Sequence, residues 1–494
     1  MSEIRIYNTL TSQKEELIPI VPGQIGMYVC GVTVYDHCHI GHARGAMIFD
    51  IIRRYLEYRG LNVKYIRNIT DVDDKIINRA REEGREPQEI AQKYTEEYNQ
   101  DMERLGIRSA TKEPRATEHM KEIIELIRRL EQKEYAYPVD GDVYFDIRKF
   151  TEYGKLSNRD IESMRAGSRV EIDPRKKDPL DFALWKSAKE GEPAWESPWG
   201  KGRPGWHIEC SAMSMKHLGE TFDIHGGGED LIFPHHENEI AQSEAATGKP
   251  FVRYWLHNGF VNINQEKMSK SLKNFFTIKE VLNQYSSEAL RLFLLSTHYR
   301  SPVNFTDAGL KDADKALERV YNTFRSAEHL LKVSSQEESG ERSREKDTPA
   351  EQSPGESSLY QRLGCVRSAF ENAMNDDFNT AEAIGRLYEA VREINIFMKD
   401  HPLLTASQRE SLQEMVNLVR ELGGILGLFQ KSEAKSDLAD DDNIVNDLME
   451  LILEIRDTCR AKKEWALADQ IRSRLQEKGI TIEDRKEGPI WKRK

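Results

Sequence analysis

The segment Cys30–Gly45 constrains the fold more than any other part of the sequence. It follows an apolar stretch, Ile25–Val29, with strand character, and it precedes Met47–Tyr58, whose apolar residues recur with the period of a helix. We therefore predict a strand-to-helix junction with His39 and His42 at the start of the helix. Free backbone N–H groups, the positive end of the helix dipole and two imidazoles would suit phosphate oxygens there. A zinc-binding pair and ordinary polar residues at a helix end are the alternatives.

Length and composition indicate a multidomain protein of a reducing compartment. A chain of 494 residues is too long for one core, so we expect about three domains or more. No apolar run is long enough to span a membrane, and the N-terminus lacks the pattern of a signal peptide. The cysteines, at positions 30, 38, 210, 365 and 459, are too scattered for a disulfide framework. We therefore predict a cytoplasmic protein.

A βαβ unit is expected around the junction. Gly60 suits the C-cap of the helix, and Val63–Ile69 is predicted to be the next strand. A parallel pair with a crossover helix begins a doubly wound nucleotide-binding sheet, whose ligands bind beyond the carboxyl ends of the strands. Thr70 follows such an end and could hydrogen-bond a substrate. Alternatively, Thr70 and Asp71 cap the helix expected from about Asp73.

An insertion is predicted to divide this sheet. It comprises two helical patterns, Pro87–Leu105 and Pro114–Lys133, and a charged stretch to about Gly205. Beyond it, Thr221–Ile224 is predicted to be a strand, and His225–Asp230, with three consecutive glycines, the loop at its carboxyl end. Glycines in such a loop allow another group to approach the backbone closely, and a flexible turn is the alternative.

Four separated residues could form a zinc site. His235 and Glu239 are four apart, so they would share one face of a helix. Together with Cys30 and Cys210 they would supply two thiolates, one imidazole and one carboxylate, a set that zinc accepts. His236 with Glu239 is a rival pair at spacing three. A buried structural cysteine and a surface ion pair are the alternatives without a metal.

Lys267 and Lys270 lie three apart in a polar segment, Lys267–Ser271, which we call the lysine loop. Their charges suit an anionic ligand whose charge changes during a reaction. A solvated loop of lysines and serines is the alternative. If the loop binds phosphate, phosphorylation of Ser271 would add about −1.5 to −2 charges at the same place and oppose that binding.

The combination of these motifs resembles one family. The signature pair of class I aminoacyl-tRNA synthetases is similar to His39-Ile40-Gly41-His42 together with Lys267-Met268-Ser269-Lys270-Ser271. The similarity to cysteinyl-tRNA synthetases extends to Cys30–Asp36, Asn68–Asp74, Trp206–Cys210 and Phe233–Glu239, and it runs from the first strand to the C-terminus. The departures are small, namely Ala43 after the second histidine and Glu229 in the glycine loop.

The resemblance implies an α/β Rossmann-like nucleotide-binding catalytic domain with an insertion, followed by an α-helical bundle and a small C-terminal anticodon-binding domain. We expect the first half of the catalytic domain at 1–110, the connective insertion at 111–205 and the second half, with the lysine loop, at 206–285. The bundle would occupy 286–430 and the C-terminal domain 431–494. Residues 333–358, rich in Ser, Glu, Pro and Arg, are predicted to be a disordered insertion in the bundle.

The resemblance also implies the reaction. A monomeric ligase of protein biosynthesis would activate L-cysteine with ATP and Mg²⁺ to cysteinyl-adenylate, and then transfer cysteine to the 3′-terminal adenosine of tRNA(Cys). One zinc ion per chain would select the cysteine thiolate, and its implied ligands are Cys30, Cys210, His235 and Glu239. The implied catalytic groups are His39, His42, Lys267 and Lys270. ATP would also contact Gly226, Gly227 and Asp230, and the substrate cysteine would contact Thr33, Thr70 and Trp206.

The C-terminal end carries local positive charge. From Cys459 to Lys494 there are 11 Lys/Arg against 6 Asp/Glu, in a chain of net charge −12. The overall charge argues against indiscriminate nucleic-acid binding, whereas a basic end suits a phosphate backbone or simply keeps a protein in solution. By resemblance, the anticodon contacts are Arg460, Trp465, Asp469 and Asp484. The segment Arg485–Pro489 departs from the family's usual sequence.

Two other functional classes share part of this pattern. A cysteine:amino-sugar ligase of thiol biosynthesis resembles a synthetase with a shortened distal half, so the long helical region and the basic end argue against it. A non-catalytic regulator would lack a signature histidine or lysine, and none is missing from this sequence.

Overall fold

The computed structural model describes residues 3–161, 173–263, 266–267, 275–341, 354–430, 438–485 and 488–493. The chain forms two compact units, Met1–Phe429 and Gln430–Lys494. None of the described helices has the length and the apolar character that crossing a membrane requires.

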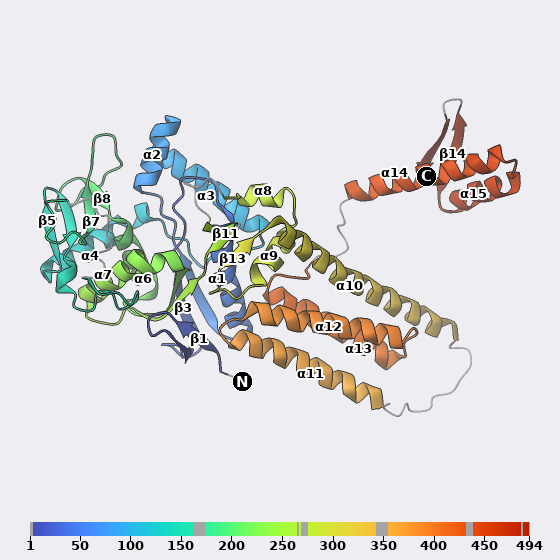
Figure 1. The fold of residues 1–494 in the computed structure, drawn as a ribbon, viewed down its shortest axis with the longest axis horizontal. Coiled ribbons are helices and arrows are strands. Elements are labelled where there is room, and N and C mark those ends of the chain that lie inside the picture. Colours follow the sequence, from blue (N-terminus) through green and yellow to red (C-terminus); the bar gives the residue numbers. More distant parts are fainter. Residues whose placement is uncertain are drawn as a thin grey trace. The chain divides into compact units, whose positions relative to one another are not determined.

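A four-stranded parallel sheet organises the first unit (Figure 1). Its strands follow the order β10 (Val252–Asn258), β9 (Phe222–Gly228), β3 (Gln24–Val29) and β4 (Asn62–Arg67). Helix α1 (Ile40–Tyr58) connects β3 to β4, so the predicted strand–helix–strand unit is present. Strands β3 and β9 pair in parallel although the insertion separates them in sequence. The predicted Rossmann-like α/β fold is confirmed, and the carboxyl ends of both halves meet at one edge of the sheet.

The apolar stripe of α1 holds this helix on the sheet. Ile48, Ile51, Ile52 and Tyr55 are each at most 5% exposed. Burying a side chain of this kind contributes roughly 1.5–3 kcal/mol, so the stripe is enough to fix the helix in place. Gly60 follows the end of the helix with φ at +84°, a left-handed conformation that favours glycine.

The insertion forms a second sheet, which is antiparallel. Its strands are β5 (Ala136–Val139), β6 (Asp142–Phe145), β7 (Phe182–Ser187) and β8 (Gly202–Pro204), in that order. The helices before it are α2 (Asp74–Glu83), α3 (Pro87–Arg104) and α4 (Met120–Gln132). Trp185 is completely buried in the core beneath this sheet.

The second half of the catalytic region returns to the parallel sheet through two helices, α6 (Trp206–Leu218) and α7 (Glu237–Thr247). Beyond β10, strand β11 (Val261–Ile263) pairs antiparallel with β12 (Glu266–Lys267) and parallel with β13 (Val303–Phe305). The remaining elements are the N-terminal hairpin, β1 (Arg5–Asn8) and β2 (Gln13–Glu16), and the short helix α8 (Ile278–Leu282).

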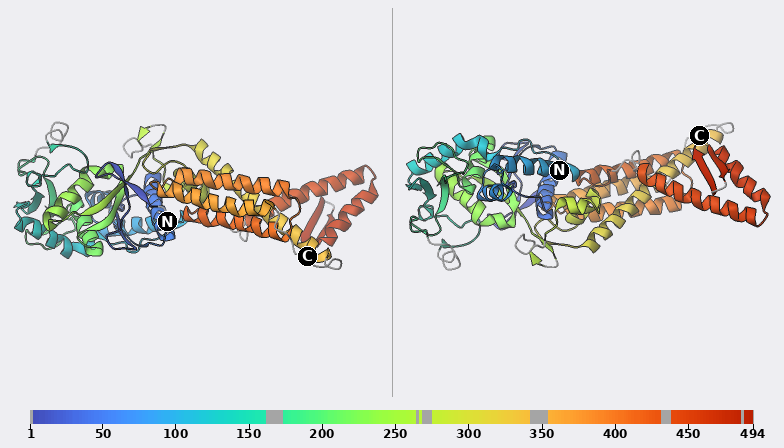
Figure 2. Two further views of the ribbon diagram at one scale, coloured as in Figure 1. Left: turned by 90° about the horizontal axis from the view of Figure 1, so that it is seen from below. Right: turned by 90° about the horizontal axis from the view of Figure 1, so that it is seen from above.

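The predicted α-helical bundle is present, and Figure 2 shows its long helices running side by side. The helices are α9 (Ser287–Leu295), α10 (Asp307–Glu341), α11 (Pro354–Asn375), α12 (Thr380–Asp400) and α13 (Ala406–Ile425). The prediction of disorder over 333–358 is wrong at both ends, because α10 and α11 extend into this range; residues 342–353 lie outside the described residues. Glu, Gln and Lys favour helix, and a nucleated helix gains one hydrogen bond for each residue added.

The second unit is small. It consists of α14 (Leu438–Ala461), α15 (Trp465–Glu477) and a hairpin of β14 (Ile480–Arg485) with β15 (Gly488–Arg493).

Candidate active site

A cavity of ≈ 370 Å³ opens at the carboxyl ends of β3 and β9. Its wall contains residues from both halves of the catalytic region and from α6, as expected for a doubly wound sheet. The predicted site residues that the structure brings together in this wall are Cys30, Thr33, His39, His42, Trp206, Gly227 and Asp230.

The two signature histidines lie together at the start of α1. His39 is the N-cap, and its ring stacks on that of His42 with 3.7 Å between the ring centroids. The backbone N–H of His39 also lies 3.3 Å from Nδ1 of His42. Both imidazoles therefore occupy the positive end of the helix dipole at the cavity wall, where an anionic ligand is favoured.

A cluster of metal-binding side chains adjoins the same cavity. Cys30 follows β3, Cys210 lies on α6, and Glu239 lies in the first turn of α7. His235 belongs to the π-helical turn Ile232–His236, which continues directly into α7, so it lies four residues before Glu239 on one helical segment, as the spacing predicts. The turn brings Nε2 of His235 within 3.0 Å of the Glu239 carboxylate.

The spacing of these four donors fits zinc. Sγ of Cys30 lies 3.7 Å from Sγ of Cys210, 3.4 Å from Nε2 of His235 and 3.4 Å from Oε1 of Glu239. All four donor atoms lie within 4.8 Å of one another. Zinc bonds of about 2.0–2.3 Å in a tetrahedron place donors about 3.3–3.8 Å apart. The three distances from Cys30 fall in this range, and the His235–Glu239 distance of 3.0 Å is slightly shorter.

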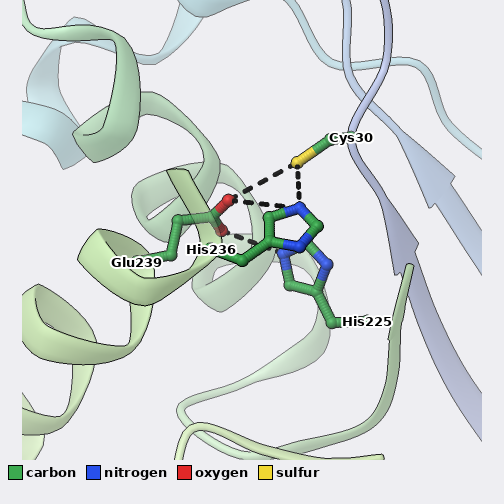
Figure 3. Close-up of side chains that lie close together, drawn as sticks. All are labelled: Cys30, His225, His236 and Glu239. Atoms are coloured by element: carbon green, nitrogen blue, oxygen red, sulfur yellow. Dashed lines mark hydrogen bonds and ion pairs between the residues drawn. The ribbon is translucent and has the colours of Figure 1, made fainter. Parts of the chain in front are cut away.

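A second set of donors overlaps the first. Figure 3 shows Cys30 and Glu239 together with His225 and His236. Nε2 of His225 lies 2.9 Å from Oε2 of Glu239, and Nε2 of His236 lies 3.3 Å from the Cys30 sulfur and 4.0 Å from the Glu239 carboxylate. The contacts alone therefore allow either set to hold a metal. Sequence reasoning overlooked His225 as a neighbour of Glu239, because its place at the end of a predicted strand marks it as a candidate site residue without indicating which residue it contacts.

The electrostatics of the cluster favour the charged forms of Glu239 and Cys210 and the neutral form of Cys30. Burial alone would raise the pKa of Glu239, but His225 and His235 hold it at about 2. A hydrogen bond from Cys30 lowers the pKa of Cys210 to about 6, against the effect of burial. Burial likewise raises the pKa of Cys30 well above its usual value. Cys210 and Glu239 are therefore the two most readily ionised donors.

The predicted contacts of the substrate cysteine divide into two layers. Thr33 and Trp206 line the cavity, and the Trp206 ring stacks on His235 with 4.0 Å between centroids. Thr70 is buried behind Thr33, to which it is joined by a backbone bridge, and it is missing from the wall that the described residues form. Its hydroxyl accepts a hydrogen bond from Nδ2 of Asn68 at 3.2 Å.

The predicted cap of α2 is also corrected. Neither Thr70 nor Asp71 caps this helix; Asp73 does, by accepting a hydrogen bond from the Lys75 N–H at 2.9 Å. Asp71 instead accepts from the backbone and the hydroxyl of Thr117. Local spacing could not distinguish these cases because the partner of Asp71 lies in a different segment.

The three glycines lie in a strand and not in a loop. Strand β9 continues through Gly228, so the predicted loop His225–Asp230 is wrong for its first four residues. A Cβ on Gly226 would overlap the ring of Phe49, and one on Gly227 would lie 2.8 Å from His236. Glycine is therefore needed at positions 226 and 227 because the side chains of Phe49 and His236 come too close to leave room for a Cβ. Gly226 is buried beneath α1, whereas Gly227 and Asp230 face the cavity.

The remaining predicted residues lie elsewhere. Lys270 and Ser271 fall outside the described residues, and of Lys267 only the backbone, in β12, is described. The proposed anticodon residues belong to the second unit, with Arg460 on α14, Trp465 and Asp469 on α15, and Asp484 on β14. Trp465 is 56% exposed, which leaves its ring accessible to a partner.

Comparison with known proteins adds an independent observation. The family of the tRNA synthetases class I (C) catalytic domain matches residues 16–315, and the DALR domain family matches residues 369–430. The cysteine–tRNA ligase of Pelobacter propionicus is 52% identical over 497 residues, which cover 99% of each chain. That of Geobacter metallireducens is 51% identical over 495 residues, again 99% of each chain. A solved methionyl-tRNA synthetase of Mycobacterium tuberculosis, in complex with methionyl-adenylate, shares the fold with a TM-score of 0.61 at 15% identity, over 82% of this chain and 90% of that one.

Proposed function

The chain belongs to the cysteine–tRNA ligase family of class I tRNA synthetases, and we propose that it joins L-cysteine to tRNA(Cys) with the aid of ATP. The observation that carries this proposal is the shared cavity, because one wall holds the signature histidines and another holds Cys30 of the metal-binding cluster. An amino acid bound through its thiol at the cluster would present its carboxylate toward a nucleotide at the start of α1.

In the first step, the cysteine carboxylate attacks the α-phosphorus of ATP, forming cysteinyl-adenylate and releasing pyrophosphate. The carboxylate is already ionised, so no general base is needed. Negative charge grows on the phosphoryl oxygens, and His39 and His42 would stabilise it from preorganised positions. Gly227 and Asp230 line the same cavity and would contact the nucleotide. Mg²⁺ would accompany ATP, and Lys267 and Lys270 would act on the departing pyrophosphate.

We assign the zinc ligands to Cys30, Cys210, His235 and Glu239. Two thiolates with one imidazole and one carboxylate suit zinc better than the rival set, which contains a single sulfur. When bound, zinc would favour the substrate's thiolate over the hydroxyl of serine, because a thiol ionises far more readily on a metal.

The surrounding histidines support this assignment. Nδ1 of His207 lies 2.8 Å from Nδ1 of His235, so it fixes the ring with Nε2 turned toward the other donors. His225 holds the second oxygen of Glu239 in the same way. In this reading His225 orients a ligand and is not a ligand itself.

In the second step, a terminal ribose hydroxyl of the tRNA attacks the adenylate carbonyl and releases AMP. The second unit would bind the anticodon through Arg460, Trp465, Asp469 and Asp484. The exposed Trp465 offers a surface for a stacked base, an interaction worth about 1–3 kcal/mol. We further propose that the protein acts in the cytoplasm as a monomer.

The first test is amino-acid-dependent ATP–pyrophosphate exchange measured with all twenty amino acids. Exchange with cysteine alone is expected, and exchange with a different amino acid would overturn the proposed substrate.

The second test concerns tRNA. Trp465→Ala should lower the rate of tRNA aminoacylation and leave exchange unchanged. Leu467→Ala on the same helix, which also removes an exposed apolar side chain, serves as the control. Equal behaviour of the two variants would exclude Trp465 from tRNA binding.

A further inference from the structure

Arg44 is an unusual residue of the signature helix. It lies two positions after His42, its side chain is completely buried, and no carboxylate among the described residues forms an ion pair with it. The guanidinium instead donates to five backbone carbonyls. Nη1 contacts Gly259 O at 2.9 Å and Phe260 O at 2.7 Å, and Nη2 contacts the carbonyls of His298, Tyr299 and Ser301 at 3.3, 3.3 and 2.5 Å.

A buried cation whose hydrogen bonds all go to backbone carbonyls is costly to desolvate, and the charge of Glu229 offsets only part of that cost. Burial lowers the pKa of Arg44 to about 10, so the group remains charged at neutral pH. A guanidinium carries five donors in a rigid plane, and a lysine ammonium cannot reproduce that pattern. The five carbonyls belong to two backbone segments, Gly259–Phe260 and residues 298–301. The role of Arg44 is therefore to fix the position of one segment relative to the other more than to add stability.

The first of these segments belongs to the active site. Gly259 and Phe260 lie in the cavity wall next to Asn258, at the end of β10, and they lead into β11, β12 and the lysine loop. The side chain of Arg44 thus joins the helix that carries the signature histidines to the chain that approaches the lysine loop.

The second segment, residues 298–301, leads from α9 to β13, which pairs with β11. The two segments touch directly, since the Gly259 N–H donates to Tyr299 O at 2.9 Å. A Cβ on Gly259 would lie 2.7 Å from Arg300 O. Arg44 therefore completes a close contact between Gly259–Phe260 and residues 298–301, which we call the Arg44 joint. Neither segment can shift without breaking its hydrogen bonds.

Helix α1 also holds the chain that leaves the lysine loop. The Ile40 N–H donates to Phe276 O at 3.1 Å, and the Ile278 N–H donates to Cys38 O at 3.0 Å. The chain is thus attached to α1 on both sides of the lysine loop, by the helix start on one side and by the Arg44 side chain on the other.

We propose that Arg44 is a positioning residue for adenylate formation: it holds the Gly259–Phe260 wall of the cavity, and the chain leading to the lysine loop, in register with His39 and His42. This inference rests on the proposed function. A displacement of about 1 Å in such a wall can slow a reaction by roughly 10²-fold, so loss of the joint should affect the nucleotide more than the amino acid.

The test compares Arg44→Lys with Arg291→Lys. Arg291 is also completely buried and also donates to backbone carbonyls, those of Leu105 and Leu426, but it is not part of the cavity wall that the described residues form. In cysteine-dependent ATP–pyrophosphate exchange, Arg44→Lys should raise KM for ATP or lower kcat by about 10–100-fold. KM for cysteine and the zinc content should stay within twofold of the wild type in both variants, and Arg291→Lys should leave all four quantities unchanged.

Equal kinetics for the two variants, at comparable thermal stability, would overturn the inference and leave the proposed function intact. A wild-type protein without cysteine-dependent exchange would overturn the proposed function, and the inference with it. If Arg44→Lys does not fold, Gly259→Ala perturbs the same joint with Arg44 in place, because its Cβ must push the two segments apart. Gly259→Ala should then show the same selective defect with ATP, and wild-type kinetics for that variant would reject the inference.

Discussion

At the proposed nucleotide end of the cavity, His39 and His42 come from one turn of α1, whereas at the proposed metal end Cys30, Cys210 and the pair of His235 and Glu239 come from three separate segments. The nucleotide end depends on backbone geometry at a helix start. The metal end depends on buried side chains that compensate one another's charge. This difference suggests a division of labour, in which the first end performs phosphoryl chemistry and the second selects the amino acid. A substitution at one end should therefore impair the role of that end and leave the role of the other end intact.

The largest expected effect follows from altering the metal end. Cys210→Ser should lose zinc and lower the preference for cysteine over serine by about 10⁴–10⁵, because a steric pocket alone separates such close analogues poorly. Zinc content and exchange with both amino acids are the measurements. Cys459→Ser, which alters a buried thiol of the second unit, is the matched control. If Cys210→Ser kept its zinc, the rival set with His225 and His236 would be favoured instead.

The next effect concerns the nucleotide end. His42→Asn should slow cysteine-dependent exchange by about 10²–10³, the usual cost of removing one preorganised donor to a transition state. Its zinc content should equal that of the wild type. His401→Asn, which alters a histidine at the end of α12, should change neither quantity. A variant His42→Asn that loses zinc together with exchange would show that the two ends are not independent.

A smaller effect is expected at the residue that orients His235. His207→Gln should weaken zinc affinity by about 10–100-fold, as is typical when the partner of a metal-binding histidine is removed. His217→Gln lies at the other end of the same helix, where the ring contacts His119, and should leave zinc affinity unchanged. Competition with a chelator of known affinity measures both. Equal affinities for the two variants would reject the orienting role of His207.

The smallest effect tests the packing between the two ends. Gly226→Ala should destabilise the protein by about 1–3 kcal/mol, because the added methyl group overlaps Phe49 of α1 in a fully packed region. Gly385→Ala in α12, where a Cβ has nothing within 4 Å, should instead be neutral or stabilise by up to about 1 kcal/mol. Unfolding by urea measures both changes. A neutral Gly226→Ala would mean that β9 and α1 tolerate a shift at this point.

Where sequence reasoning failed, the partners of a residue lay in another element. The period of Met47–Tyr58 predicted α1 correctly, since helix formation and burial of one face are local properties. Reasoning from local sequence also placed the three glycines in a loop. Their neighbouring residues give no indication that Phe49 and His236 pack against them. Thr70 follows the carboxyl end of a strand as expected, yet the bridge to Thr33 places it behind the cavity wall.

The sequence by itself determined the strand-to-helix junction, the placement of two imidazoles at a helix start and the residue types that can bind zinc. These follow from spacing within one element and from the chemistry of single side chains. Only the tertiary structure decided that β9 runs through its glycines, that His207 and His225 lie beside the proposed metal ligands, and that Arg44 joins two segments at the cavity wall. Such contacts join residues far apart in the chain, and a single sequence carries no local signal of which elements will pack against each other.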